Sequence, residues 1–243
     1  EIHRLAATFD RMFDRLEHSF NAEKRFASDA SHELRTPIAV IIAECEYARQ
    51  NAKTVEDYQE SMEVVERQSR KMSTLVNQLL NITRMDQGTQ RLSFERANYS
   101  ELCEIVCDEA AVASGRDVQL EKDIEPGVYA NMDVGLMARL VQNLVENAFK
   151  YTAEGGKVRV SLHAQSGRLR LEVRDTGIGI DKKDLPHIWE RFWQADSSRG
   201  VDRGSGLGLS MVKQIAEAHG GRLEVESRPG EGSCFSYTMD CSN

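Results

Sequence analysis

A histidine, a glutamate and a threonine lie within about one helical turn near the start of the chain. They are His32, Glu33 and Thr36, in the stretch "ASDASHELRTPIAV" at residues 27–40. A neutral imidazole is a nucleophile near neutral pH, and a neighbouring carboxylate can accept the ring proton as the imidazole attacks. On an ideal helix His32 lies roughly 200° from Leu34, away from the apolar stripe. The alternative is an ordinary exposed histidine, which this local pattern favours when taken alone.

Two amides and an ammonium share one face of a second predicted helix. Asn143, Asn147 and Lys150 follow one another at spacings i, i+4 and i+7 in "NLVENAFKY", residues 143–151. Amide oxygens can coordinate Mg²⁺ that also carries phosphate oxygens, and a lysine can neutralise those phosphates. The competing interpretation is a solvated polar stripe.

An aspartate follows a predicted strand and precedes two glycines in "DTGIGI", residues 175–180. The glycines Gly177 and Gly179 would let the backbone approach a flat ligand. The carboxylate of Asp175 would accept a hydrogen bond from an exocyclic amino group of that ligand. This segment therefore predicts a nucleobase contact.

A long irregular segment ends in a glycine cluster. Residues 189–206, "WERFWQADSSRGVDRGSG", have the length and composition of a functional lid or a disordered loop. The stretch "GSGLGL", residues 204–209, then opens a helix, whose first N–H groups form an anion site. A strand does not precede this cluster, so it lacks the context of a dinucleotide-binding fingerprint.

The elements that must position these residues differ between the two halves of the chain. Residues 1–87 contain one proline and no glycine, and their apolar residues recur at spacings of three and four. This heptad pattern predicts a long helix and an antiparallel second helix, joined by a polar turn with Thr54 as a cap. Two helices with one apolar stripe each bury little surface alone, so we expect a dimeric four-helix bundle. Pro37 predicts a bend beside His32.

The second half alternates apolar and polar residues in five segments. Three further segments have helical periodicity. The pattern predicts an α+β sandwich, in which helices cover one face of a mixed, mostly antiparallel sheet. The stretch "QGTQRLSFERAN", residues 87–98, reads as the linker between the halves.

Composition narrows the class of protein. The chain has 243 residues and a formal net charge of −8, which disfavours nucleic-acid binding. No apolar run approaches the roughly 18 residues of a membrane span. The five cysteines are scattered and predict reduced, structural thiols in a cytosolic chain. The chain begins in mid-helix, which suggests a fragment of a longer protein.

Together, in this order and spacing, the four segments of the second half resemble the N, first glycine, F and second glycine boxes of sensor histidine kinases. Their ATP-binding domain belongs to the gyrase, chaperone and MutL-like ATPases, and the resemblance covers residues 98–240. It implies ATP and Mg²⁺ as cofactors, with the metal at Asn147 and Asn143. The other implied nucleotide-binding residues are Lys150, Tyr151, Asp175, Gly177, Gly179, Arg199, Gly204, Gly206, Leu207 and Gly208.

One position separates the members of this superfamily. Those that hydrolyse ATP resemble this pattern but place a glutamate at the position of Asn143 to activate water. An amide cannot act as a base, and Glu146 lies off the face that Asn143 and Asn147 share. A nucleotide bound here is therefore better suited to giving its phosphoryl group to another acceptor than to water.

The first half supplies that acceptor. "F-x-x-D-A-S-H-E-L-R-T-P", residues 26–37, resembles the H-box of histidine kinases of the HisKA dimerisation and phosphotransfer type. The resemblance implies that His32 is autophosphorylated, that Glu33 is the general base and that Thr36 orients water when a partner is dephosphorylated. Residues 1–17 are similar to the last helix of a HAMP signal-relay module.

These observations predict four parts: residues 1–17, a HAMP-like helix; 18–87, the phosphotransfer hairpin; 88–97, a linker; and 98–240, the ATP-binding domain. The predicted function is that of the cytoplasmic core of a transmembrane sensor histidine kinase. Its predicted partners are a second copy of the chain and a response-regulator receiver domain, with membrane contact only through upstream segments and no nucleic acid. The alternative is a phosphatase-dominant or scaffold-type member with a regulatory ATP domain.

Overall fold

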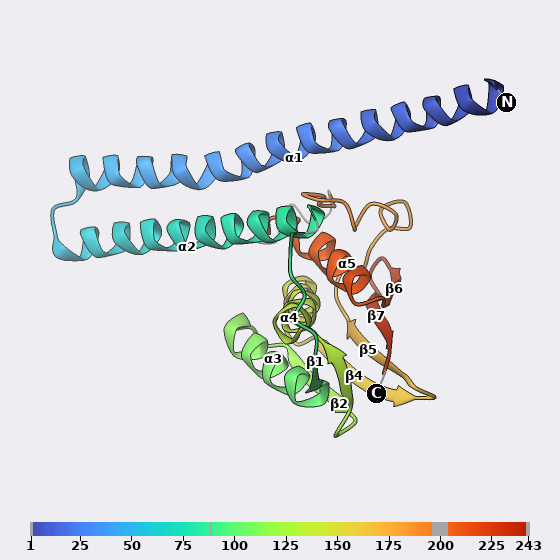
Figure 1. The fold of residues 1–243 in the computed structure, drawn as a ribbon. Coiled ribbons are helices and arrows are strands. Elements are labelled where there is room, and N and C mark those ends of the chain that lie inside the picture. The colour runs from blue at the N-terminus through green and yellow to red at the C-terminus, as the bar shows by residue number, and fades with distance from the viewer. Residues whose placement is uncertain (1, 88, 196–203, 242–243) are drawn as a thin grey trace. The chain divides into compact units, whose positions relative to one another are not determined.

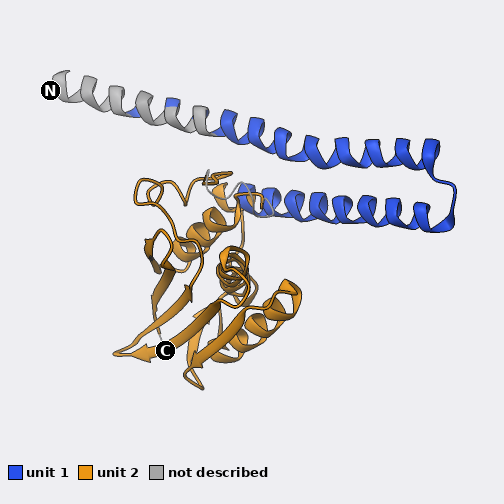
Figure 2. Ribbon diagram, turned by 180° about the vertical axis from the view of Figure 1, so that it is seen from behind, with its two compact units in different colours: residues 1–83 blue, residues 84–243 orange. Residues whose placement is uncertain are grey.

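The structure is a computed structural model that describes residues 2–87, 89–195 and 204–241. In residues 2–22 it describes the helical backbone, with the side chains of Met12, Glu17 and Phe20 alone. The chain divides into two compact units, residues 1–83 and 84–243, which Figure 2 colours separately. Each unit is described by itself below.

Two long antiparallel helices form the first unit (Figure 1). Helix α1 spans Ile2–Asn51 and continues through Pro37, and α2 spans Val55–Asp86, its last three residues belonging to the second unit. The Ser61 hydroxyl on α2 donates to the Glu44 carboxylate on α1 at 2.8 Å. The predicted helical hairpin is therefore present. Among the described residues, no helix combines the length and apolarity needed to cross a membrane.

Thr54 caps α2 as its sequence predicts. The Asp57 backbone N–H donates to Thr54 Oγ1 at 3.2 Å, and the Thr54 N–H donates back to Asp57 Oδ2 at 3.0 Å. The Lys53 N–H adds a third bond to the same carboxylate, at 2.9 Å. The backbone hydrogen bonds from Lys53 and Thr54 hold the pKa of Asp57 below its usual value. This reciprocal pairing satisfies N–H groups that a helix start leaves unpaired.

A five-stranded sheet and three helices form most of the second unit. Its elements in chain order are β1 (Glu95–Asn98), α3 (Tyr99–Ser114), β2 (Gln119–Ile124), β3 (Tyr129–Met132), α4 (Val134–Tyr151), β4 (Lys157–Gln165), β5 (Arg168–Asp175), α5 (Gly208–Ala218), β6 (Arg222–Arg228) and β7 (Gly232–Asp240). The sheet order is β2-β4-β5-β7-β6, with β2 parallel to β4 and every other neighbouring pair antiparallel. The predicted mixed, mostly antiparallel sheet is confirmed. Strand β1, which pairs with β3, lies at the end of the predicted linker and was not anticipated.

One face of the sheet carries the core, and α3, α4 and α5 cover it (Figure 1). Val158, Val160 and Leu162 of β4 are fully buried, whereas the intervening Arg159 and the nearby His163 are exposed. This alternation is the period-two pattern that the sequence shows. Burial of such apolar surface is the main favourable contribution to folding, at roughly 25 cal/mol per Å².

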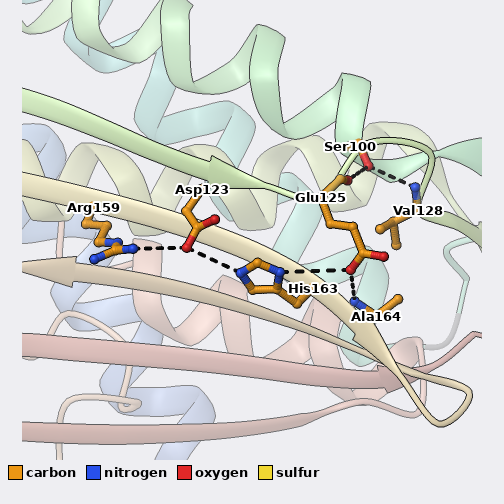
Figure 3. A network of polar contacts seen from close by, with 7 residues as sticks. All are labelled: Ser100, Asp123, Glu125, Val128, Arg159, His163 and Ala164. Carbon is orange, nitrogen blue, oxygen red and sulfur yellow. Dashed lines mark hydrogen bonds and ion pairs between the residues drawn. The ribbon is translucent and has the colours of Figure 1, made fainter.

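A polar network joins β2 to β4 at the end of the parallel pair (Figure 3). The Asp123 carboxylate lies 3.0 Å from the Arg159 guanidinium and 3.4 Å from His163 Nε2. The hydrogen bond from Arg159, followed by that from His163, lowers the pKa of Asp123. The Ala164 N–H donates to the Glu125 carboxylate at 2.8 Å. These groups are exposed, so each ion pair adds little stability.

His219 ties the end of α5 to the start of α4. The Asp133 N–H donates to His219 Nε2 at 3.0 Å, and His219 Nδ1 lies 2.8 Å from the Ile215 carbonyl oxygen. Because a backbone N–H can only donate, Nε2 is the acceptor and the ring proton sits on Nδ1. Asp133 also caps α4, since its Oδ1 accepts from the Leu136 N–H at 3.0 Å. The two helices that carry the predicted phosphate-binding residues are thus joined by one side chain.

All five cysteines are free thiols. Cys103 and Cys107 are fully buried on α3, and burial raises the pKa of Cys107 to about 12. A thiol with so high a pKa is a poor nucleophile at neutral pH. The structure therefore agrees with the predicted structural role of these two cysteines.

Candidate functional site

The His32 ring is exposed on α1, and Thr36 lies one turn further on. The Thr36 hydroxyl donates to the His32 carbonyl oxygen at 3.4 Å, and Glu33 is half-buried beside them. Pro37 has no N–H to donate to the Glu33 carbonyl, so this turn of the helix lacks one backbone hydrogen bond. The structure thus brings His32 and Thr36 onto one accessible helix surface.

Asp175 ends β5 and is 6% exposed. Its Oδ1 accepts from the Gly177 N–H at 2.8 Å and from the Ser233 N–H at 3.2 Å. Burial raises the pKa of Asp175, and the hydrogen bonds from Gly177 and Ser233 oppose that rise. Both hydrogen bonds end on Oδ1, so Oδ2 is the oxygen suited to accept a hydrogen bond from a ligand amino group.

Gly177 and Gly179 lie where a side chain would collide with backbone. A Cβ at Gly177 would be 2.4 Å from the Tyr151 carbonyl oxygen and 2.8 Å from Asp175 Oδ1. A Cβ at Gly179, where φ is +67°, would be 1.9 Å from the Arg228 carbonyl oxygen. Only glycine fits these positions, where the loop lies against the end of α4 at Gly177 and against the end of β6 at Gly179.

The start of α5 lies against the polar face of α4. A Cβ at Gly204 would be 2.7 Å from Lys150 Nζ, and a Cβ at Gly208 would be 2.8 Å from Asn143 Oδ1. The Asn143 amide donates to the Arg139 carbonyl at 2.7 Å, which leaves Oδ1 directed towards Gly208. Two segments that are far apart in the sequence therefore meet.

The N-terminus of α5 has no side-chain cap, because the residue at the capping position is the fully buried Leu207, whose side chain has no polar atom. Its first N–H groups are thus able to bind an anion. Just before it, Gly206 has φ +68°, and its carbonyl oxygen accepts from the Phe192 N–H at 2.9 Å. The Gln194 amide donates to the Gly204 carbonyl at 2.6 Å. Arg199, the remaining predicted phosphate contact, lies outside the described residues.

Three α4 side chains complete the group. Asn147 is half-buried one turn after Asn143, and the Lys150 ammonium lies 4.9 Å from the centre of the Tyr151 ring. Burial raises the pKa of Tyr151, so its hydroxyl stays neutral. Glu146 is exposed and accepts from Gln142 at 2.7 Å, off the face that carries the two asparagines.

Ser233 is a site residue that sequence reasoning missed. The sequence of residues 232–240 predicts only a strand, yet the Ser233 N–H helps to hold Asp175. A Cβ at Gly232, where φ is +90°, would be 2.0 Å from the Asp175 carbonyl oxygen. The glycines in "PGEGS" were the available signal, because such glycines mark close backbone approach.

A buried carboxylate, amide oxygens, an ammonium and an uncapped helix N-terminus therefore lie around one region of the second unit. Each group complements part of a nucleoside polyphosphate: the carboxylate an exocyclic amino group, and the other groups the phosphates with their metal. The chemistry of these groups suits a nucleoside polyphosphate, in a unit that follows a helical hairpin with an exposed histidine.

Family models match two parts of the chain. Residues 22–88 match the His Kinase A (phospho-acceptor) domain, and residues 132–243 match the histidine kinase-, DNA gyrase B- and HSP90-like ATPase domain. The two matches together cover well over half of the chain, and its relatives are sensor histidine kinases. The chain belongs to the sensor histidine kinase family.

Individual relatives agree. The sensor histidine kinase YkoH of Bacillus subtilis (strain 168) is 34% identical over 245 residues, covering 100% of this chain and 53% of YkoH. The chain thus spans about half the length of that relative. The structure of full-length ShkA in complex with AMPPNP has a TM-score of 0.63 at 26% identity, covering 86% of this chain and 44% of ShkA. The histidine kinase ThkA, solved in complex with the response regulator protein TrrA, shares the fold with a TM-score of 0.68 at 22% identity, covering 94% of this chain and 66% of that one.

Proposed function

We propose that this chain is the catalytic core of a transmembrane sensor histidine kinase, which binds ATP with Mg²⁺ and phosphorylates His32. The observation that carries the proposal is the amide at position 143. Asn143 Oδ1 faces Gly208 at the start of α5. At the position of Asn143, the ATP-hydrolysing members of the superfamily carry a glutamate. An amide cannot activate water, which favours transfer to a protein side chain.

The residues of the second unit would bind the nucleotide. Asp175 Oδ2 would accept a hydrogen bond from the adenine amino group, because Oδ1 already accepts from the Gly177 and Ser233 N–H groups. Asn143 and Asn147 would hold Mg²⁺ through their amide oxygens, and Lys150 would neutralise phosphate charge. Bound ATP supplies the phosphoryl group and Mg²⁺ offsets its charge, while the side chains orient it.

His32 would act as the nucleophile. A ring nitrogen forms the bond to the γ-phosphorus while the bond from that phosphorus to the bridging oxygen of the ADP leaving group breaks. The proton on the other ring nitrogen passes to the Glu33 carboxylate, so the phosphorylated imidazole remains neutral at the ring. The exposure of His32 suits an acceptor that a separate unit must reach.

The proposed partners are a second copy of the chain and a response regulator. The complex of ThkA with TrrA supports the second partner, which would take the phosphoryl group from His32 onto an aspartate. The match to the phospho-acceptor domain supports the first, as do Ile42 and Met62, which are 54% and 58% exposed in the single chain. Membrane attachment through upstream segments, a HAMP-like helix at residues 1–17 and a location on the cytoplasmic side remain parts of this proposal. So do the linker at 88–97 and an ATP-binding domain at 98–240.

Labelling with γ-labelled ATP tests the proposal. The chain should acquire label that is labile in acid and stable in alkali, as a phosphoramidate is. Bound nucleotide without labelling would favour the scaffold-type member. Release of labelled phosphate without protein labelling would show an ATPase instead.

Thr36 bears on the phosphatase alternative, because its hydroxyl lies one turn from His32. We expect Thr36→Ala to slow dephosphorylation of the response regulator by about tenfold or more, since a hydroxyl that orients water is lost. Autophosphorylation should change by less than about twofold. Thr36→Ser, which keeps the hydroxyl, is the matched control. A larger loss of autophosphorylation than of dephosphorylation would contradict the assignment.

Gly208→Ala tests the contact between α5 and Asn143. The new Cβ would lie 2.8 Å from Asn143 Oδ1, so that amide must move. We expect ATP affinity in Mg²⁺ to fall about tenfold, whereas stability holds or rises because alanine favours a helix by up to about 1 kcal/mol over glycine. Calorimetric titration and thermal unfolding measure the two effects. Gly135→Ala is the control, since its Cβ would meet only Asp133 Oδ1, at 3.6 Å. Unchanged affinity in Gly208→Ala would show that Asn143 does not serve the nucleotide.

A further inference from the structure

Arg116 binds the end of α4 from a loop that sequence reasoning did not single out. Its Nη1 donates to the carbonyl oxygens of Phe149, Lys150 and Thr152 at 3.1, 2.8 and 3.1 Å. Gly115 ends α3 with φ +58°, a left-handed conformation that reverses the chain and places Arg116 beside α4. The arginine side chain thus bridges two elements more than 30 residues apart in sequence.

The last turn of α4 is satisfied by only a few donors. The final carbonyls of a helix have no partner within the helix. The Thr152 N–H and hydroxyl donate to the Ala148 carbonyl oxygen, at 3.2 and 2.7 Å. The Ile178 N–H donates to the Tyr151 carbonyl oxygen at 3.2 Å. Phe149 and Lys150 are served by Arg116. The guanidinium therefore supplies the middle of the helix terminus, and its charge complements the negative end of the helix dipole.

This same turn carries two residues of the nucleotide site. The Lys150 ammonium meets Gly204 and lies over the Tyr151 ring, while the Tyr151 carbonyl holds the loop of Gly177 and Gly179 through Ile178. Fraying of the last turn would displace Lys150, because its own carbonyl accepts one of the Arg116 bonds. The adenine contact at Asp175 stands on β5 and is held by Ser233 of β7 as well as by Gly177 of that loop, so it depends less on the end of α4 than Lys150 does.

We propose that Arg116 is a positioning residue, which orders the end of α4 so that Lys150 meets the phosphates of the nucleotide. This inference rests on the proposed function, since it assumes that ATP occupies the site. Arg116 is an exposed residue, and the buried core of the unit lies elsewhere. Its loss should therefore act on phosphate binding more than on the fold.

Titration of the whole chain with ATP and, separately, with adenosine tests the inference. In Arg116→Ala, affinity for ATP in Mg²⁺ should fall about tenfold, because a displaced Lys150 loses roughly one charge-assisted hydrogen bond to the phosphates. Affinity for adenosine should stay within about twofold. Arg116→Lys should recover part of the loss, because an ammonium can still donate to two of the carbonyls. Arg168→Ala is the matched control: it removes an exposed arginine that pairs with Asp240 at 3.0 Å, at the opposite end of β5 from Asp175.

The outcomes separate the two proposals. A wild-type chain that binds no ATP overturns the proposed function, and this inference with it. Unchanged ATP affinity in Arg116→Ala overturns the inference alone. Equal losses for ATP and adenosine, together with a lower unfolding midpoint, would also overturn it by showing a purely structural role. If Arg116→Ala does not fold, Arg116→Lys gives the same test through the ratio of its ATP loss to its adenosine loss.

Discussion

Replacing His32 by glutamine is expected to abolish labelling of the chain by γ-labelled ATP while leaving ATP affinity within about twofold. The glutamine amide keeps polarity and similar size but has no nucleophilic lone pair at the ring position. His32 lies on α1 in the first unit, whereas the nucleotide residues lie in the second, so binding does not depend on it. The loss should reach the limit of detection, because without the acceptor the transfer step has no substitute.

His163→Gln is the matched control for this experiment. His163 is also an exposed histidine, but it lies between Asp123 and Glu125 at the end of β4 (Figure 3). Its variant should be labelled like the wild-type chain. Label that persists in His32→Gln would mean that another side chain accepts the phosphoryl group, and the assignment of His32 would be wrong. Release of free phosphate at an equal rate by the wild-type chain and by His32→Gln would indicate hydrolysis of ATP.

Local sequence pattern was enough to predict the elements whose burial follows a simple period. Val158, Val160 and Leu162 alternate with polar residues in β4. Thr54 could be predicted as a cap because its signal lies within three residues of its partner. The two glycine segments could be placed near the α4 amides only through the family resemblance, since nothing local links Gly208 to Asn143.

The parts that escaped prediction depend on contacts between distant segments. Strand β1 has the sequence "ERAN", with no apolar alternation, and it forms because Arg96 and Ala97 pair with Asn131 and Ala130 of β3. Arg116 is one arginine in a loop, and its three acceptors lie 33 to 36 residues away. Such side chains follow no period, because tertiary packing alone decides what they meet.

Asp175→Asn is expected to weaken ATP binding by about 100-fold or more without unfolding the domain. The asparagine carbonyl oxygen can still accept from the Gly177 and Ser233 N–H groups, as Oδ1 does now. Its NH₂ group then points where Oδ2 pointed. The asparagine NH₂ and the adenine amino group are both donors, so no hydrogen bond forms between them. A buried polar mismatch of this kind is what gives hydrogen-bonding sites their strong discrimination.

The raised pKa of Asp175 predicts the effect of the same substitution on stability. A carboxyl whose pKa is higher in the folded chain than in the unfolded chain contributes stability below its unfolded pKa and loses it as pH rises through the folded pKa. At neutral pH the ionised, desolvated Asp175 is therefore a cost to folding. Asparagine removes that cost, so the unfolding free energy of Asp175→Asn at pH 7 should equal or exceed that of the wild-type chain. The site thus sacrifices some stability for recognition.

Titration of ATP affinity against pH distinguishes this account from a simple loss of structure. Wild-type affinity should fall as the pH drops through the raised pKa of Asp175, at a higher pH than an ordinary aspartate would give, because the protonated carboxyl presents a donor. The weak residual binding of Asp175→Asn should lack this dependence. Asp123→Asn, which alters an exposed carboxylate whose pKa is lowered instead, should keep both the affinity and the pH profile of the wild-type chain. A destabilised Asp175→Asn chain, or an unchanged pH profile, would show that Asp175 serves the fold and that adenine is recognised elsewhere.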